Sequence, residues 1–258
     1  MCIRDSKPAE LVPSSAWALA DIISRAGLPA GVFNMLIGPG RSVGDTIIRS
    51  PLVDGISFTG SEHTGRQIAR LAAEDMKKVQ LEMGGKNPLI VLDDADLEQA
   101  VEVALNGSFY STGQRCTASS RVIVTEGIHD AFVARLAERT RALEVGDALQ
   151  ASTDIGPVVD SRQLEQNLAY VAAGLEQGAK LVCGGERIDN QAGAYFFTPA
   201  LFTEVTPDMR IYREEIFGPV LSVLKVRDHD EAFAAAEDTA FGLSAGIVTT
   251  SLRHAEHF

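Results

Sequence analysis

Short apolar segments alternate with helical patterns along almost the whole chain, and this alternation limits the possible folds more than any other feature. Apolar runs of strand length lie at residues 32–37, 56–58, 79–83, 89–92 and 121–124. Helical spacing or a glycine-rich turn follows each run, which is typical of a parallel sheet covered by helices. We therefore expect an α/β fold with mostly parallel sheets, and later strands near residue 201, at 221–226 and at 245–249.

The alternation restarts at Gly84-Gly85, which predicts a boundary between two α/β units. We expect the first unit to span residues 7–83 and the second to span residues 84–258. Residues 1–6 fit neither pattern and are expected to be extraneous or to stay unassigned. The helical pattern that opens at residue 251 stops abruptly, so the sequence is interpreted as an internal fragment of a longer protein.

Composition excludes several classes of function. The net charge of −12 and the pI near 4.9 disfavour binding to nucleic acid or to an anionic membrane surface. No apolar run approaches the roughly 20 residues that span a bilayer. The three cysteines, Cys2, Cys116 and Cys183, are too sparse for a disulfide framework and favour a reducing, cytoplasmic compartment. Spacings typical of metal ligands are lacking, so no metal site is expected.

Two glycine-framed motifs carry the residues best suited to chemistry. Residues 81–88 read LEMGGKNP and include Glu82, whereas residues 113–117 read GQRCT and include Cys116. A thiol is a good nucleophile when its thiolate is favoured, and a nearby carboxylate can act as a general base on the thiol or on water. Alone, each residue is better explained as a surface glutamate or a packed cysteine. Their occurrence together in two such motifs favours a catalytic pair.

Two further turns are ambiguous when taken alone. The spacing from Gly60 to Gly65 matches neither a Rossmann fingerprint nor a P-loop, although the turn lies between a strand and a helix where backbone N–H groups could hold a phosphate. In the segment EEIFGP at residues 214–219, an acid pair and an aromatic residue precede a Gly-Pro turn. This segment reads equally well as a charged helix end or as a carboxylate and ring presented to a ligand.

Taken together and in this order, the motifs FTGS at 58–61, LEMGGKNP at 81–88, GQRC at 113–116 and EIFGPV at 215–220 resemble those of the NAD(P)-dependent aldehyde dehydrogenase family. The resemblance covers residues 7–258. It implies that the first unit is the C-terminal part of a Rossmann-type NAD(P)-binding domain and that the second is the catalytic domain, truncated at its C-terminus. Within the family, the wording around Cys116 most resembles α-ketoglutaric semialdehyde (2,5-dioxovalerate) dehydrogenases.

The resemblance also implies a role for each matching catalytic residue. Cys116 would attack the aldehyde to give a thiohemiacetal, and its backbone N–H would help to hold the oxyanion. After hydride transfer to the nicotinamide, Glu82 would activate the water that hydrolyses the thioester. The two side chains are expected to face one cleft. The family's asparagine that completes the oxyanion hole has no counterpart in this sequence.

The same resemblance places the cofactor, which is NAD or NADP. Lys7 and Glu10 match positions that contact the adenosine ribose, and Gly60 and Ser61 match the phosphate-side turn. Glu215 and Phe217 match the pair that positions the nicotinamide ribose and ring. All of these roles are implied by the resemblance to the family.

A carboxylate at Glu10 favours NAD because it would repel the 2′-phosphate of NADP, although the ammonium of Lys7 acts in the opposite direction. We expect a small-molecule aldehyde as the substrate and a homo-oligomeric parent protein. Hydrolytic aldehyde oxidation is expected. The alternatives are acyl transfer to coenzyme A, reduction of an acyl phosphate, and a non-catalytic use of the same fold.

Arg115 is the one residue that bears on the substrate. Because it immediately precedes Cys116, its guanidinium could pair with the carboxylate of a short ω-oxo acid such as 2,5-dioxopentanoate. The alternative is that Arg115 only braces its loop against a neighbouring acid. The two interpretations are nearly equal on the sequence.

Overall fold

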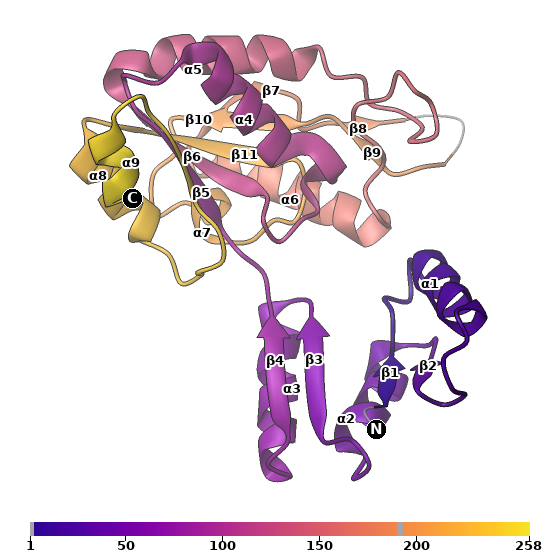
Figure 1. The fold of residues 1–258 in the computed structure, drawn as a ribbon. Coiled ribbons are helices and arrows are strands. Elements are labelled where there is room, and N and C mark those ends of the chain that lie inside the picture. The colour runs from indigo at the N-terminus through magenta and orange to yellow at the C-terminus, as the bar shows by residue number, and fades with distance from the viewer. Residues whose placement is uncertain (1–2, 190–192) are drawn as a thin grey trace. The chain divides into compact units, whose positions relative to one another are not determined.

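The computed structural model describes residues 3–189 and 193–258, and the chain divides between Met83 and Gly84 into two units (Figure 1). Cys2 lies outside the described residues. Each unit has its own strands and helices. The division falls at the glycine pair where the alternation of the sequence restarts.

The first unit contains two pairs of parallel strands. β1 (Arg4–Ser6) pairs with β2 (Phe33–Met35), and β3 (Gly55–Thr59) pairs with β4 (Lys78–Glu82). The helices of this unit are α1 (Ser14–Arg25), the π-helical turn η1 (Gly40–Gly44), α2 (Asp45–Arg49) and α3 (Glu62–Glu74). η1 runs directly into α2, so this helical segment is a π-helical turn followed by a short α-helix.

The second unit is built on a six-stranded sheet in the order β12-β5-β6-β11-β10-β7. Its strands are β5 (Asn87–Val91), β6 (Ser119–Thr125), β7 (Lys180–Cys183), β10 (Ala200–Thr203), β11 (Val220–Val226) and β12 (Gly246–Val248). The first five strands in this order are parallel, whereas β7 pairs with β10 in the antiparallel direction. A short hairpin of β8 (Arg187–Ile188) and β9 (Phe196–Phe197) lies outside the sheet.

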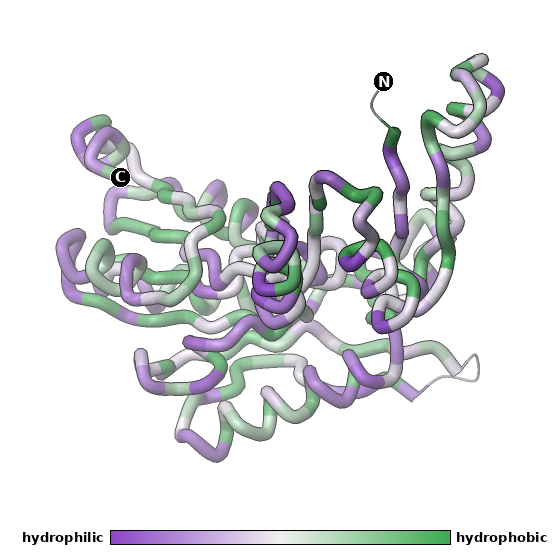
Figure 2. The backbone as a smooth tube through the Cα atoms, turned by 90° about the horizontal axis from the view of Figure 1, so that it is seen from below, coloured by the Kyte–Doolittle hydropathy of each residue, from purple (hydrophilic) through white to green (hydrophobic). Residues whose placement is uncertain are grey.

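Helices cover both faces of this sheet because its central strands are apolar on both sides. The helices are α4 (Leu97–Phe109), the 3₁₀ turn η2 (Tyr110–Gly113), α5 (Glu126–Arg141), α6 (Ser161–Glu176), α7 (Arg210–Arg213), α8 (His229–Glu237) and α9 (Leu252–His257). Figure 2 shows hydrophobic and hydrophilic residues interspersed along the chain, as expected for helices with one buried face.

Two buried clusters make up the core of the second unit, one on each face of the sheet. Ile90 and Ile123 pack with residues of α6, α7 and α8, whereas Val91 and Val122 pack with residues of α4 and α5. Successive residues of a strand point to opposite faces, so β5 and β6 contribute to both clusters. The result is a three-layer α/β/α arrangement, as Figure 1 shows for this unit.

The parallel pairing fixes where the sequence motifs of this unit lie. Residues 84–86 precede β5, residues 113–116 precede β6, and residues 215–219 precede β11. Since β5, β6 and β11 are neighbours and parallel, the segments that precede them meet at one edge of the sheet. This is the amino-terminal edge, whereas ligands of open α/β sheets usually bind at the carboxyl ends of the strands.

Candidate active site

Cys116 lies in a tight turn between the end of η2 and the start of β6. The backbone N–H of Ala118 donates to the carbonyl of Arg115 at 3.0 Å, so Cys116 and Thr117 are the two central residues of this turn. Cys116 is half-buried and carries a free thiol. A thiol held at a turn and not fully covered is accessible to a small electrophile.

An unusual backbone conformation leads into this turn. Ser111, Thr112 and Gly113 have φ values of 55°, 58° and 62°, so three consecutive residues are left-handed. Such a conformation costs on the order of 1–3 kcal/mol for each residue other than glycine and persists only where neighbours hold it. Thr112 is buried, and its hydroxyl donates to the carbonyl of Gly156 at 3.2 Å. The turn that carries Cys116 is therefore fixed from its N-terminal side.

Gly113 brings this segment against the turn that precedes β11. A Cβ atom at Gly113 would lie 2.5 Å from the carbonyl oxygen of Gly218 and 2.9 Å from the nitrogen of Pro219. Only a glycine allows this backbone approach in a left-handed conformation. The contact joins the Cys116 loop to the segment that carries Glu215 and Phe217.

Glu215 lies against the glycine pair of the other motif. The backbone N–H of Gly85 donates to Glu215 Oε1 at 3.1 Å, and a Cβ atom at Gly84 would overlap the same carboxylate. Phe217 has a φ of 58° and is 40% exposed, so its ring is presented to solvent. A carboxylate fixed by backbone and an adjacent exposed ring fit the recognition of a ribose and a planar base.

The acid pair at residues 214 and 215 divides into two different environments. Glu214 accepts a hydrogen bond from Tyr170 Oη at 2.7 Å and forms an ion pair with Arg210 at 3.0 Å. The hydrogen bond from Arg210, assisted by that from Tyr170, lowers the pKa of the Glu214 carboxyl. Glu214 therefore holds α6 and α7 together, which leaves Glu215 as the member of the pair that faces the motif of residues 84–86.

Lys86 is a buried lysine whose amine interacts electrostatically with Glu215 and Glu214. Its side chain is 2% exposed, and its Nζ has no hydrogen-bond partner within residues 3–189 and 193–258. Desolvation, with repulsion from Arg121 as the second cause, lowers the pKa of Lys86 to about 7, while Glu215 and Glu214 act in the opposite direction. The site therefore contains an amine whose charge changes near neutral pH.

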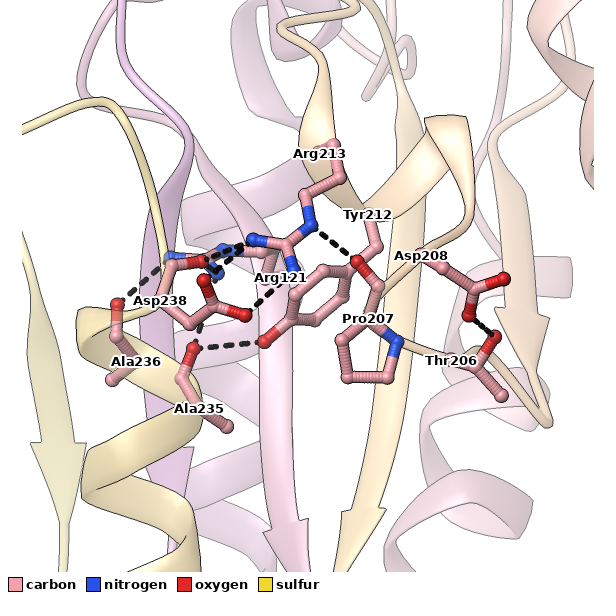
Figure 3. A network of polar contacts seen from close by, with 9 residues as sticks. All are labelled: Arg121, Thr206, Pro207, Asp208, Tyr212, Arg213, Ala235, Ala236 and Asp238. Atoms are coloured by element: carbon pink, nitrogen blue, oxygen red, sulfur yellow. Dashed lines mark hydrogen bonds and ion pairs between the residues drawn. The ribbon is translucent and has the colours of Figure 1, made fainter.

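Arg121 anchors the backbone of Lys86 to the end of α8. Its Nε donates to the carbonyl of Lys86 at 3.0 Å, and its Nη2 donates to the carbonyl of Ala236 at 3.0 Å. Arg213 reaches the same helix end, where it forms an ion pair with Asp238 at 2.6 Å (Figure 3). Cations at a helix C-terminus stabilise its free carbonyls. The loop before β5 is thus tied to an element far away in the sequence.

Arg115 points its guanidinium at its own scaffold. Nη2 donates to the carbonyls of Asn106 and Gly107, both at 2.9 Å, in the last turn of α4. These contacts favour the interpretation in which Arg115 braces the loop, against backbone carbonyls and not against an acid. Its contact with a substrate stays a prediction.

Asn87 is a residue of this site that the sequence reasoning missed. Its Nδ2 donates to the carbonyls of Cys116 at 2.7 Å and of Ala118 at 2.9 Å. It belongs to the LEMGGKNP motif at residues 81–88, but nothing in the local pattern predicts its contact with the Cys116 turn. Cys183, by contrast, lies in β7 against the second core cluster, and burial raises the pKa of its thiol, in agreement with a packing role.

The remaining predicted residues belong to the first unit. Glu82 is the exposed last residue of β4, and its carbonyl accepts a hydrogen bond from the N–H of Gly60 at 3.0 Å. Ser61 caps α3 through a bond from Thr64 N to its Oγ at 3.3 Å. The N–H of Gly60 is thus engaged, so a phosphate at this turn would use the free N–H groups of the first turn of α3. That Glu82 and Cys116 face one cleft stays a prediction.

The two ribose candidates lie near the start of the chain. Lys7 is half-buried, and its Nζ donates to the carbonyl of Pro8 at 2.9 Å. Glu10 is exposed in a turn before α1. A lysine and a glutamate with accessible ends can bind ribose hydroxyls. These positions fit an adenosine ribose, and that role is a prediction.

Residues 3–189 and 193–258 contain no group of three or more His, Cys, Asp or Glu side chains placed to hold a metal ion. In the same part of the chain no helix is both long enough and apolar enough to cross a membrane.

Comparison with known proteins decides the family. The sequence profile described as "Aldehyde dehydrogenase family" matches residues 5–258. The chain belongs to the aldehyde dehydrogenase family. The family and the α/β fold expected from the motifs are thereby confirmed, since solved aldehyde dehydrogenase structures superpose on almost the entire chain.

The relatives differ in name from the subgroup that the Cys116 motif suggested. A protein of Mesorhizobium japonicum named betaine aldehyde dehydrogenase is 49% identical over 96% of this chain and 51% of its own length. One of Brucella anthropi with the same name is 47% identical over 95% of this chain and 51% of its own. The chain spans about half the length of the curated relatives it matches. Neither relative is named as a semialdehyde dehydrogenase.

Solved aldehyde dehydrogenases share the fold. An NAD-dependent aldehyde dehydrogenase from Sinorhizobium meliloti superposes with a TM-score of 0.97 at 43% identity, covering 99% of this chain and 51% of that one. Betaine aldehyde dehydrogenase from Staphylococcus aureus in complex with NAD⁺ superposes with a TM-score of 0.96 at 35% identity, covering 99% and 51%. At 43% and 35% identity, the similarity to these two enzymes includes the amino-acid sequence as well as the fold.

Proposed function

We propose that this chain carries the nucleophile and part of the cofactor site of an NAD-dependent enzyme that oxidises an aldehyde to its carboxylate. One observation carries the proposal. The segments before β5, β6 and β11 meet at one sheet edge, where Gly113 contacts Gly218 and Gly85 binds Glu215. These contacts connect the Cys116 loop with the segment of Glu215 and Phe217, which supports the proposal that a nucleotide binds there.

The proposed reaction begins at Cys116. Its thiolate attacks the carbonyl carbon of the aldehyde, and the backbone N–H of Cys116 donates to the resulting oxyanion. Bound NAD⁺ supplies a hydride acceptor, so that the thiohemiacetal carbon loses a hydride and becomes a thioester. Glu82 then takes a proton from water, and the hydroxide displaces the Cys116 thiolate. Aldehyde, NAD⁺ and water give carboxylate, NADH and two protons.

The cofactor assignment rests on fit and on relatives. Glu215 and Phe217 would receive the nicotinamide ribose and ring, and Gly60 with Ser61 would border a phosphate. Lys7 and Glu10 would receive the adenosine ribose. The superposed Staphylococcus aureus enzyme binds NAD⁺, which supports NAD over NADP. The assignment of residues 7–83 to cofactor binding and of residues 84–258 to catalysis belongs to this proposal.

The proposed substrate is a short ω-oxo acid such as 2,5-dioxopentanoate, bound with the help of Arg115. A second candidate is betaine aldehyde, because the relatives at 47–49% identity carry that name. The two differ in charge, since one carries a carboxylate and the other a quaternary ammonium group. The positive charge of Arg115, whose Nη2 binds carbonyls of α4, would attract the first and repel the second.

A substrate panel on the full-length protein tests both levels of the proposal. NADH formation is measured with ω-oxo acids, betaine aldehyde and uncharged aldehydes of equal length, with and without coenzyme A. Hydrolytic oxidation predicts turnover without coenzyme A and its loss in Cys116→Ala. Turnover that requires coenzyme A would identify an acylating enzyme, and turnover that survives Cys116→Ala would refute the mechanism. If kcat/KM is higher for betaine aldehyde than for the ω-oxo acids, betaine aldehyde would replace the ω-oxo acid as the proposed substrate.

A further inference from the structure

Asn87 connects the glycine motif to the nucleophile turn, and no motif assigned it a role. We propose that Asn87 is a positioning residue for Cys116, whose carboxamide fixes the turn that presents the thiol. The inference rests on the proposed function of Cys116 as the nucleophile. It concerns the backbone on the C-terminal side of that residue, whereas the left-handed segment fixes its N-terminal side.

The carboxamide of Asn87 makes three hydrogen bonds. Nδ2 donates to the carbonyl of Cys116 at 2.7 Å and to that of Ala118 at 2.9 Å, and Oδ1 accepts from the N–H of Ser244 at 3.1 Å. Two carbonyls need a donor and one N–H needs an acceptor, so the partners fix the orientation of the amide. The residue is 4% exposed, so water does not compete for these bonds.

These bonds hold a central residue of the turn and its last residue. The carbonyl of Cys116 belongs to the peptide that follows the nucleophile, so holding it restricts the ψ angle of Cys116. The carbonyl of Ala118 holds the last residue of the turn, where β6 begins. The Ser244 bond ties the amide to the segment before β12. A single side chain at the start of β5 thus links three neighbouring strands at their amino ends.

Gly85 provides the space that this arrangement needs. A Cβ atom at Gly85 would lie 2.7 Å from Asn87 Oδ1 and 3.0 Å from the carbonyl oxygen of Cys116. Both distances are closer than ordinary carbon–oxygen contacts. The glycine motif and the nucleophile turn are therefore packed against each other through Asn87, and the spacing between Gly85 and Asn87 is a requirement of the site.

Two replacements of different chemistry test the role. Asn87→Asp keeps the shape but replaces the donor with an oxygen, so both carbonyls lose their partner and a charge is added. Asn87→Ser is uncharged and too short to bind both carbonyls. Leu136→Ala, in α5 on one face of the sheet, serves as a control that destabilises the core without touching the turn.

The readouts separate positioning from stability. We measure kcat, the aldehyde KM, the Kd for NAD⁺, and the rate constant for alkylation of Cys116 by iodoacetamide against pH, all in the full-length protein at temperatures where circular dichroism shows it folded. Both variants should lower kcat about 10- to 100-fold, because a displacement of about 1 Å at a reacting group costs about 100-fold. The KM and the Kd should stay within threefold, and the alkylation rate constant should change at least fivefold. The Leu136→Ala control should lower Tm and leave alkylation unchanged.

Three outcomes would overturn the inference. The first is alkylation and kcat within twofold of wild type in either folded variant. The second is an effect confined to Asn87→Asp with a raised pH midpoint, which would report the added charge alone. The third is an equal effect in Leu136→Ala, which would report general loss of stability. If Asn87→Asp does not fold, Asn87→Ser decides. Failure of the proposed function is seen separately, as turnover that survives Cys116→Ala, whereas alkylation reports on the turn in either case.

Discussion

Replacing the buried Lys86 with methionine should stabilise the protein, and by an amount that depends on pH. Methionine has a similar length and no charge, so it fills the same space without an amine that must be desolvated. In the folded protein the pKa of Lys86 is about 7, against 10.5 for a free lysine. One pKa unit corresponds to 1.36 kcal/mol, so the shift amounts to about 5 kcal/mol as an upper value.

The direction of the pH dependence follows from proton binding. Below pH 7 the lysine is charged in both the folded and the unfolded state, so the wild type bears the full cost of burial. Between pH 7 and 10.5 the unfolded state holds a proton that the folded state lacks, and the free energy of unfolding rises by about 1.4 kcal/mol for each pH unit. The advantage of Lys86→Met should therefore be about 2–4 kcal/mol at pH 6.5 and about 2–3 kcal/mol smaller at pH 9.

The assay is urea unfolding of both proteins at pH 6.5, 7, 8 and 9. Lys180→Met is the control, because Lys180 is 64% exposed and its contact with Glu204 spans 3.6 Å. Its effect should stay within about 0.5 kcal/mol at every pH, as expected for an exposed ion pair. The reasoning would be refuted by a stability difference between Lys86→Met and wild type that is the same at pH 7 and pH 9. It would also be refuted by a destabilised variant at pH 6.5.

Four further predictions concern the site. Glu82→Gln should give a burst of NADH followed by a much slower steady state in stopped-flow measurements, since hydride transfer precedes the step that needs the base; equal loss of both phases would place Glu82 earlier in the reaction. Arg115→Leu should raise KM for ω-oxo acids alone by about 10- to 100-fold if it pairs with their carboxylate. A lower Tm with equal loss for all aldehydes would instead identify a brace. Gly113→Ala should destabilise the protein by about 1–3 kcal/mol in urea unfolding, because its Cβ would meet Gly218 in a left-handed conformation; an unchanged midpoint would contradict the close approach. Glu10 should favour NAD over NADP in kcat/KM, and a clear NADP preference would show that its assignment is wrong.

The strands of the second unit could be predicted because strands that are buried on both faces appear in the sequence as continuous apolar runs. The apolar runs at 89–92 and 121–124 are observed as β5 and β6, and the run at 221–226 is observed as β11. Each supplies residues to both core clusters, so few polar side chains interrupt the run. The short elements α7 and β8 were not foreseen, since four and two residues carry no measurable periodicity.

The site could be predicted only as a set of residue types. Glu214 and Glu215 are identical in sequence terms, and only the positions of Tyr170 and Arg210 in the fold separate a structural acid from one that faces the glycine pair. The role of Asn87 depends in the same way on a carbonyl that lies far along the chain. Such contacts follow from strand order and register, which local pattern does not encode.

The pairing of β6 with β11 has a consequence for how the protein assembles. In this pair Arg121 lies opposite Ser222, so the centre of the sheet joins two segments that are far apart in the sequence. During synthesis, β6 therefore leaves the ribosome well before β11. Pairings of this kind form late, because closing a long loop costs entropy before any contact repays it. Until β11 pairs with β6, the Gly218 turn cannot contact Gly113, and the loop that carries Cys116 lacks this neighbouring segment. A nascent or refolding chain should therefore expose a freely reactive Cys116, vulnerable to oxidation, until the last strands are in place.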